Sequence, residues 1–153
     1  MKKGQIHSDI NGAEHIMVCL SASPSNVKII KTAAKMASAF GGSFTALYVK
    51  SANTDKMDEF DAIAFGCPSM GAEQLEEDEF EPMFTACESK LSGKKIALFG
   101  SYGWGDGEWM RNWVKQMQDA GAEVLGGEDA ICCDAPDDEA EEKLVELGKK
   151  LAE

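Results

Sequence analysis

The chain contains few residues of the kinds that perform catalysis near neutral pH. Its only histidines are His7 and His15, both near the N-terminus, and no Ser/His/Asp or Cys/His arrangement accompanies them. The five cysteines are odd in number and include no C-x-x-C pair, which favours reduced thiols over disulfides or metal ligands. The sequence therefore predicts neither a catalytic residue nor a metal site.

Positive charge is also scarce. The 15 Lys and Arg residues are outnumbered by 27 Asp and Glu residues, so the formal net charge is −12. Such a chain is repelled by nucleic-acid backbones and anionic membranes, and it is attracted to basic protein surfaces. No apolar run approaches the roughly 20 residues of a membrane-spanning helix, and the polar start "MKKGQIHSDINGAEH" lacks the apolar stretch of a signal peptide. We therefore expect a cytoplasmic protein without nucleic-acid or membrane partners.

Apolar strand patterns alternate with helical patterns along the chain. They predict strands at about 15–20, 43–49, 61–66, 94–100 and 122–133, and helices at about 24–40, 79–91, 107–120 and 137–152. Continuous apolar strands separated by helices indicate an α/β fold with a parallel sheet that is covered on both faces. The length of 153 residues suits one compact domain.

Two loops that follow predicted strands carry unusual residues. The first loop, Cys67–Glu73, contains Met70, and the second, Ser101–Gly107, interleaves glycines with Tyr102 and Trp104. Open α/β sheets bind ligands beyond the carboxyl ends of their strands. The glycines leave backbone amides open to a planar ligand, which a thioether and an aromatic ring would sandwich. The alternatives are a core-filling methionine and a tight glycine-rich corner.

Four strings between residues 58 and 153 point to a family: "DAIAFGCPSMGAE", "LEEDEFEPMF", "GKKIALFGSYGWGDGEWM" and "ELGKKLA". This part of the chain resembles the short-chain flavodoxins of anaerobic bacteria. The resemblance implies an FMN-binding electron carrier that is not an enzyme and that docks basic redox partner proteins. It also implies a flavodoxin-like three-layer α/β/α sandwich, with a five-stranded parallel sheet in the order 2-1-3-4-5.

The resemblance further implies which residues contact the flavin. Met70 and Trp104 would flank the isoalloxazine ring, and the Gly71 carbonyl would turn toward the reduced ring nitrogen. Glu73 would accept a hydrogen bond from the ring imide, while amides at residues 103–105 would meet a ring carbonyl oxygen. An acidic site disfavours the fully reduced anion, so FMN would become a strong reductant. The full set is Ser69, Met70, Gly71, Ala72, Glu73, Ser101, Tyr102, Gly103, Trp104, Gly105 and Asp106.

The turn after the first predicted strand differs from the flavodoxin pattern. A flavodoxin carries a T/S-x-T-G-x-T phosphate loop there, whereas this chain has "SASPSN" at residues 21–26. A helix start and three serine hydroxyls favour an anion site, but Pro24 lacks an amide and no glycine permits a close wrap. We therefore predict weakened or absent FMN binding; alternatively, Ser25 only caps a helix. The predicted phosphate contacts are Ser21, Ser23, Ser25 and Asn26.

The N-terminal strings "SASPSN", "TAAKMASAF" and "FTALYV" point to a different family. Residues 4–57 resemble the universal-stress-type domain of Kdp potassium sensor kinases. Its cyclic di-AMP signature is matched by Ser21, Ser23, Phe44, Thr45, Ala46 and Tyr48. We therefore interpret the chain as an engineered chimera, with units 1–57 and 58–153 in one domain. The alternative functions are a cyclic di-AMP or nucleotide-binding module and a cofactor-free scaffold for testing fragment compatibility.

Overall fold

Parallel strands form a single sheet at the centre of the molecule. The computed structural model describes residues 15–20, 43–48, 54–60 and 62–153. Within these ranges the strands pair in the order β2-β1-β3-β4-β5. Their bounds are β1 His15–Leu20, β2 Ser43–Tyr48, β3 Ala62–Gly66, β4 Lys95–Tyr102 and β5 Glu123–Cys133. Every pairing is parallel, and β1 lies between β2 and β3 because Met17 pairs with Thr45 on one side and Ile63 on the other.

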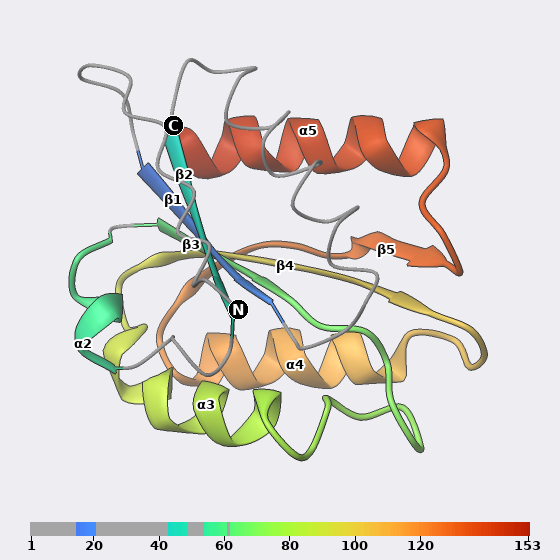
Figure 1. The fold of residues 1–153 in the computed structure, drawn as a ribbon, viewed down its shortest axis with the longest axis horizontal. Coiled ribbons are helices and arrows are strands. Elements are labelled where there is room, and N and C mark those ends of the chain that lie inside the picture. The colour runs from blue at the N-terminus through green and yellow to red at the C-terminus, as the bar shows by residue number, and fades with distance from the viewer. Residues whose placement is uncertain (1–14, 21–42, 49–53, 61) are drawn as a thin grey trace, which may run out of the picture.

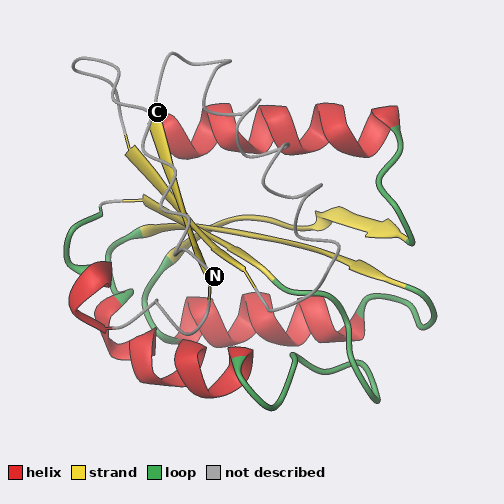
Figure 2. Cartoon of the chain, in the orientation of Figure 1, coloured by secondary structure: helices red, strands yellow, loops and turns green. Residues whose placement is uncertain are grey.

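Helices cover both faces of this sheet (Figure 1). Helices α3 (Phe80–Cys87) and α4 (Glu108–Asp119) lie on one face, and α5 (Asp138–Ala152) lies on the other. Figure 2 shows the same arrangement by element type, with loops joining strand ends to helices. The helix predicted at 24–40 lies outside the described residues. None of the described helices is long and apolar enough to cross a membrane.

Helix α5 illustrates why its sequence is helical. Asp137 caps its start, since its Oδ1 accepts a hydrogen bond from the Ala140 N–H at 2.9 Å. The first turn is acidic, and the last turn carries Lys149 and Lys150, so both ends complement the helix dipole. The helix predicted at residues 137–152 is therefore confirmed. The single turn α2 (Thr54–Met57) was not predicted, because four residues are too few to show a helical period.

The core lies between the sheet and helices α3 and α4. Ile63 and Phe65 of β3 are fully buried, and aromatic rings from both helices pack over them. Phe84 meets Phe65 edge-on at 5.4 Å between ring centroids, and Trp113 meets Phe80 edge-on at 5.5 Å. Such pairs contribute about 0.5–1.5 kcal/mol beyond the burial of their surface. This packing joins α4 to α3 over the sheet, and the start of α4 borders the second of the two unusual loops.

Candidate functional site

The first unusual loop is a tight turn beyond β3. Met70 and Gln74 exchange two backbone hydrogen bonds of 2.8 and 2.9 Å and so close a short hairpin. Gly71 and Glu73 at its tip have positive φ values of 53° and 52°. The left-handed region is unfavourable for a glutamate, so the conformation of Glu73 must be held by its contacts. The hairpin therefore presents its tip residues in one defined arrangement.

The second loop is tied directly to the first. The Ser69 N–H donates to the Ser101 carbonyl at 2.9 Å, and the Cys67 N–H donates to the Phe99 carbonyl at 3.2 Å. These bonds continue the pairing of β3 with β4 past the end of β3 at Gly66. Burial raises the pKa of the Cys67 thiol to about 12, so this side chain stays a neutral part of the core. The two loops thus leave the sheet side by side.

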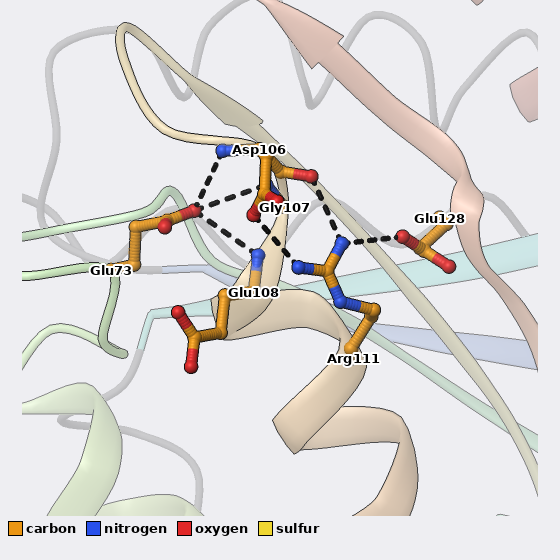
Figure 3. A network of polar contacts seen from close by, with 6 residues as sticks. All are labelled: Glu73, Asp106, Gly107, Glu108, Arg111 and Glu128. Carbon is orange, nitrogen blue, oxygen red and sulfur yellow. Dashed lines mark hydrogen bonds and ion pairs between the residues drawn. The ribbon is translucent and has the colours of Figure 1, made fainter.

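Glu73 forms the main side-chain connection between the loops (Figure 3). Its Oε1 accepts backbone hydrogen bonds from Asp106 at 3.2 Å, Gly107 at 3.0 Å and Glu108 at 3.1 Å. Gly107 is the N-cap residue of α4 and has no side chain, so this carboxylate takes the capping role and meets the positive end of the helix dipole. Oε2 makes no hydrogen bond to the described residues, which leaves it for a ligand.

Large apolar side chains are exposed on both loops. Met70 is 46% exposed and Trp104 is 64% exposed, and among the described residues these are the only large apolar side chains that are exposed to solvent. Glycines flank Trp104, and a Cβ atom at Gly103 would lie no closer than 3.8 Å to its nearest neighbour, Asp134 Oδ1. A thioether and an indole on two joined loops suit the faces of a flat, largely apolar ring.

Tyr102 takes a different position from Trp104. Its ring packs against Trp109 at 5.8 Å between centroids, and its carbonyl accepts a hydrogen bond from the Asp134 N–H at 2.8 Å. Trp109 is itself buried in the core. Tyr102 thus anchors the second loop to the core through Trp109, while Trp104 is exposed at the surface.

Arg111 is a residue of this region that the sequence analysis did not identify. Its Nη1 donates to the Asp106 carbonyl at 3.0 Å and to Glu128 Oε1 at 2.8 Å, while Nη2 donates to Asp106 Oδ1 at 2.7 Å (Figure 3). Hydrogen bonds to Glu128 and then to Asp106 raise the pKa of Arg111, so it is always charged. One signal was present in the sequence: Arg111 is the only arginine in the chain.

The predicted phosphate residues and the alternative nucleotide site are only partly within the described structure. Ser21, Ser23, Ser25 and Asn26 lie outside it. Phe44, Thr45, Ala46 and Tyr48 are part of β2, which forms an edge of the sheet beside β1. The last residue of β1, Leu20, pairs with Gly66 at the end of β3. The carboxyl end of β1 therefore lies beside the carboxyl end of β3, from which the first loop emerges.

Comparisons with known proteins agree with this fold and identify its family. The flavodoxin family model matches residues 28–148. The chain is 44% identical over 112 residues to the flavodoxin of Clostridium beijerinckii, covering 73% of this chain and 80% of that protein. It is 45% identical over 114 residues to the flavodoxin of Megasphaera elsdenii, covering 74% and 80%.

Solved structures give the same result. The solution structure of two-electron reduced Megasphaera elsdenii flavodoxin has a TM-score of 0.76 and 34% identity, and the match covers 88% of this chain and 98% of that one. An archaeal flavodoxin has a TM-score of 0.74 at 21% identity, covering 91% and 96%, and shows the fold alone. The molecule therefore has a flavodoxin-like α/β fold. By its sequence as well as its fold, the chain belongs to the flavodoxin family.

Membership of this family confirms the main functional prediction. The protein is an FMN-binding electron carrier and not an enzyme. The family match begins at residue 28, well before the predicted unit boundary at residues 57 and 58. The comparisons therefore give no support to a chimera or to a Kdp-type N-terminal unit. They also do not support a cyclic di-AMP module or a cofactor-free scaffold.

Proposed function

We propose that Met70 and Trp104 hold the isoalloxazine ring of FMN between the two joined loops. The observation that carries this proposal is the exposure of both side chains, 46% and 64%, on loops that hydrogen-bond to each other. A large apolar side chain left open to water gains free energy when a ligand covers it. FMN supplies the electron-transfer chemistry, and the protein supplies the binding surface and the electrostatic environment.

Glu73 serves both loops and ligand in this proposal. Its Oε1 keeps residues 106–108 in place, and its Oε2 accepts the hydrogen bond of the ring imide. Gly71 has a φ of 53°, and no atom lies within 4 Å of the position that a Cβ would take. Because Gly71 is a glycine, its backbone has the freedom that its carbonyl needs to turn toward the ring. Ala72 is exposed at the same tip and borders the ring edge.

The second loop contributes backbone groups and shape. Gly103 and Gly105 offer amides to a ring carbonyl oxygen, and a side chain at Gly105 would collide with the Glu73 carboxylate. Ser69 and Ser101 act indirectly, since the hydrogen bond between their backbones sets the spacing of the loops. Asp106 and Glu73 make the site acidic. This charge disfavours an anionic reduced ring and favours docking of basic redox partner proteins.

We further propose that Ser21, Ser23, Ser25 and Asn26 contact the FMN phosphate and that they bind it more weakly than a glycine- and threonine-rich loop. Leu20 precedes these residues and pairs with Gly66 at the carboxyl end of β3, from which the first loop emerges. This position supports the proposed placement. The whole chain, residues 1–153, would then form one domain around a five-stranded sheet of order 2-1-3-4-5.

Titration of the apoprotein with FMN and with riboflavin tests both parts. Riboflavin lacks the phosphate, so its affinity reports the ring contacts alone. Trp104→Ala should raise the dissociation constant of riboflavin about tenfold, because a stacked aromatic contact contributes about 1–3 kcal/mol. Trp104→Phe is the matched control, since it keeps an aromatic face. We expect its affinity to stay within about threefold of the unsubstituted protein.

The comparison of the two ligands isolates the phosphate. We expect FMN to bind more tightly than riboflavin. The difference in affinity should be smaller than the several charge-assisted hydrogen bonds of a full phosphate loop would give. Equal affinities would show that residues 21–26 add nothing. Unchanged riboflavin affinity in Trp104→Ala would show that the ring lies elsewhere.

A further inference from the structure

Asp106 is held from two opposite sides. Its N–H donates to Glu73 Oε1 of the first loop at 3.2 Å. Its carbonyl and its Oδ1 accept hydrogen bonds from the Arg111 guanidinium at 3.0 and 2.7 Å. Figure 3 shows this chain of contacts running from Glu73 through Asp106 to Arg111 and Glu128. Asp106, near the end of the second loop, is thereby fixed in position by both of its peptide groups.

The backbone around Asp106 has little order of its own. Gly105 and Gly107 have φ values of 93° and 92°, in the region that favours glycine. Glycine loses more conformational freedom than any other residue when it is fixed. Asp106 itself is 76% exposed in its side chain, so burial does not hold it. Side-chain contacts must therefore supply the order of this segment.

Arg111 is suited to this task in a way that lysine is not. A guanidinium is planar and offers several donors in a rigid fork, whereas an ammonium is a single point charge. Here the fork reaches one backbone carbonyl and two carboxylates. The other 14 basic residues of the chain are lysines, so the only arginine stands where this geometry is used.

The far anchor, Glu128, lies on an irregular part of β5. Leu98 pairs with Gly126 but Gly100 pairs with Ile131, so the ladder is shifted between them and residues 127–130 leave the regular pairing. Gly126 and Gly127 have φ values of 79° and 88°, which permit this bulge. A bulge re-aims side chains, and here it places the Glu128 carboxylate 2.8 Å from Arg111 Nη1.

We propose that Arg111 is a positioning residue for the flavin ring: anchored on Glu128, it fixes Asp106 so that the second loop is ordered before FMN binds. The proposal rests on the ring placement proposed above. Ordering a loop in advance lowers the cost of binding, so Arg111 contributes to affinity without touching the ligand. An exposed ion pair contributes little to global stability, which separates this role from a merely structural one.

The test compares Arg111→Met with Lys115→Met. Lys115 lies one turn further along α4 and forms an exposed ion pair with Asp119 at 2.6 Å, away from both loops. Amide hydrogen exchange of the apoprotein measures loop order without any flavin. Arg111→Met should accelerate exchange at residues 106–108 and raise the riboflavin dissociation constant about fivefold. Lys115→Met should do neither, and both should keep the unfolding midpoint of the unsubstituted protein.

Two further measurements sharpen the result. Arg111→Lys keeps the charge and loses the fork, so it should recover less than half of the lost affinity on a logarithmic scale. Riboflavin is uncharged, so salt can affect its binding only by screening charges within the protein. High salt should weaken the ion pairs of Arg111 and therefore weaken riboflavin binding to the unsubstituted protein, but it should not weaken binding to Arg111→Met.

The outcomes separate the two proposals. Exchange and affinity that change no more in Arg111→Met than in Lys115→Met would overturn the positioning role. Faster exchange with unchanged riboflavin affinity would also overturn it, because loop order would then not limit binding. Unchanged riboflavin affinity in Trp104→Ala, by contrast, would overturn the ring placement itself, whatever the result for Arg111.

Discussion

Gly100 shows how one missing side chain places the first loop. It lies in β4, and a Cβ atom there would collide with the carbonyl oxygen of Cys67 and crowd the Trp109 ring. The backbone of the first loop runs close alongside β4 at this point, and the Ser69 to Ser101 hydrogen bond follows one residue later. The spacing of the two loops, and therefore the width of the proposed ring site, depends on a glycine that does not itself face the site.

Gly100→Ala should therefore destabilise the protein, and Gly103→Ala should not. A Cβ atom at Gly103 would meet only Asp134 Oδ1, at an ordinary contact distance of 3.8 Å, and Gly103 has no positive φ, so its substitution is the matched control. We expect a loss of about 2 kcal/mol in the free energy of unfolding for Gly100→Ala, because the blocking atom is backbone and cannot rotate away. Urea unfolding of both apoproteins measures it. Equal stability of the two variants would contradict the close approach.

Some roles of single residues are not visible in the sequence. Trp109 and Trp113 are four residues apart, a spacing that favours packing on one helix face, and both are buried in the core. The contact between Arg111 and Glu128 spans 17 residues and depends on a strand bulge, which no local period reports. Family resemblance assigned Glu73 to the ligand, but its role as the cap of α4 depends on a contact 33–35 residues away.

At the scale of elements, one short segment starts two helices. Glu73 caps α4. Three residues later, Glu76 caps α3: its Oε2 accepts from the N–H groups of Glu79 at 3.0 Å and Phe80 at 2.8 Å, and its Oε1 accepts from Asp78 at 2.8 Å. Neither helix has a capping side chain at its own N-cap residue. From composition alone, these acidic residues would be read as the solvated start of a helix. The structure instead shows that Glu73 and Glu76 accept hydrogen bonds from specific backbone N–H groups.

The Glu76 cap predicts a pH dependence of stability. Burial opposes its charge, but hydrogen bonds from Phe80, Asp78 and Glu79 outweigh it and lower the pKa of Glu76 below its ordinary value. A carboxyl whose pKa is lower in the folded state stabilises the protein above the unfolded pKa. That contribution is lost as the pH falls through the folded pKa. Glu76→Gln should thus cost about 1 kcal/mol at pH 7.

The check is thermal or urea unfolding from pH 7 downward. The stability difference between the unsubstituted protein and Glu76→Gln should begin to shrink near pH 4, the ordinary range of glutamate, and vanish below it. Glu77→Gln serves as the control, because Glu77 is exposed and its substitution changes the net charge by the same amount. A difference for Glu76→Gln that matches Glu77→Gln at every pH would show that only net charge matters.

Element positions were predicted far better than the contacts between elements. Strands at 15–20 and 122–133 and the helix at 137–152 agree with β1, β5 and α5 within about two residues, because apolar periodicity is a local property. The helix predicted at 79–91 instead divides into α3 and a 3-10 turn at Glu88–Lys90. Glu76 and Arg111 were missed because a carboxylate or guanidinium shows its partner only after the chain has folded.

At the scale of the molecule, the N-terminal strand β1 is an interior strand of the sheet, with β2 at the edge beside it. β1 hydrogen-bonds with β2 on one side and with β3 on the other, from Met17↔Ile63 to Leu20↔Gly66. Removal of β1 would expose the edge of β3, whose residues Ile63 and Phe65 are fully buried. An N-terminal unit that folded separately would need a hydrophobic core of its own. Instead, β1 pairs with β3 and so belongs to the same sheet as the C-terminal strands.

Unfolding should consequently be a single cooperative transition. All three tryptophans lie after residue 103, so their fluorescence reports the C-terminal half, and amide exchange at β1 and β2 reports the N-terminal strands. We expect both probes to give the same urea midpoint, because opening β1 exposes the β3 edge and destabilises the core above it. Amides of β1 should also be protected as strongly as those of β3. Exchange of β1 and β2 at clearly lower urea, with tryptophan fluorescence still native, would show that residues 1–57 fold as a separate unit and that the single-domain proposal is wrong.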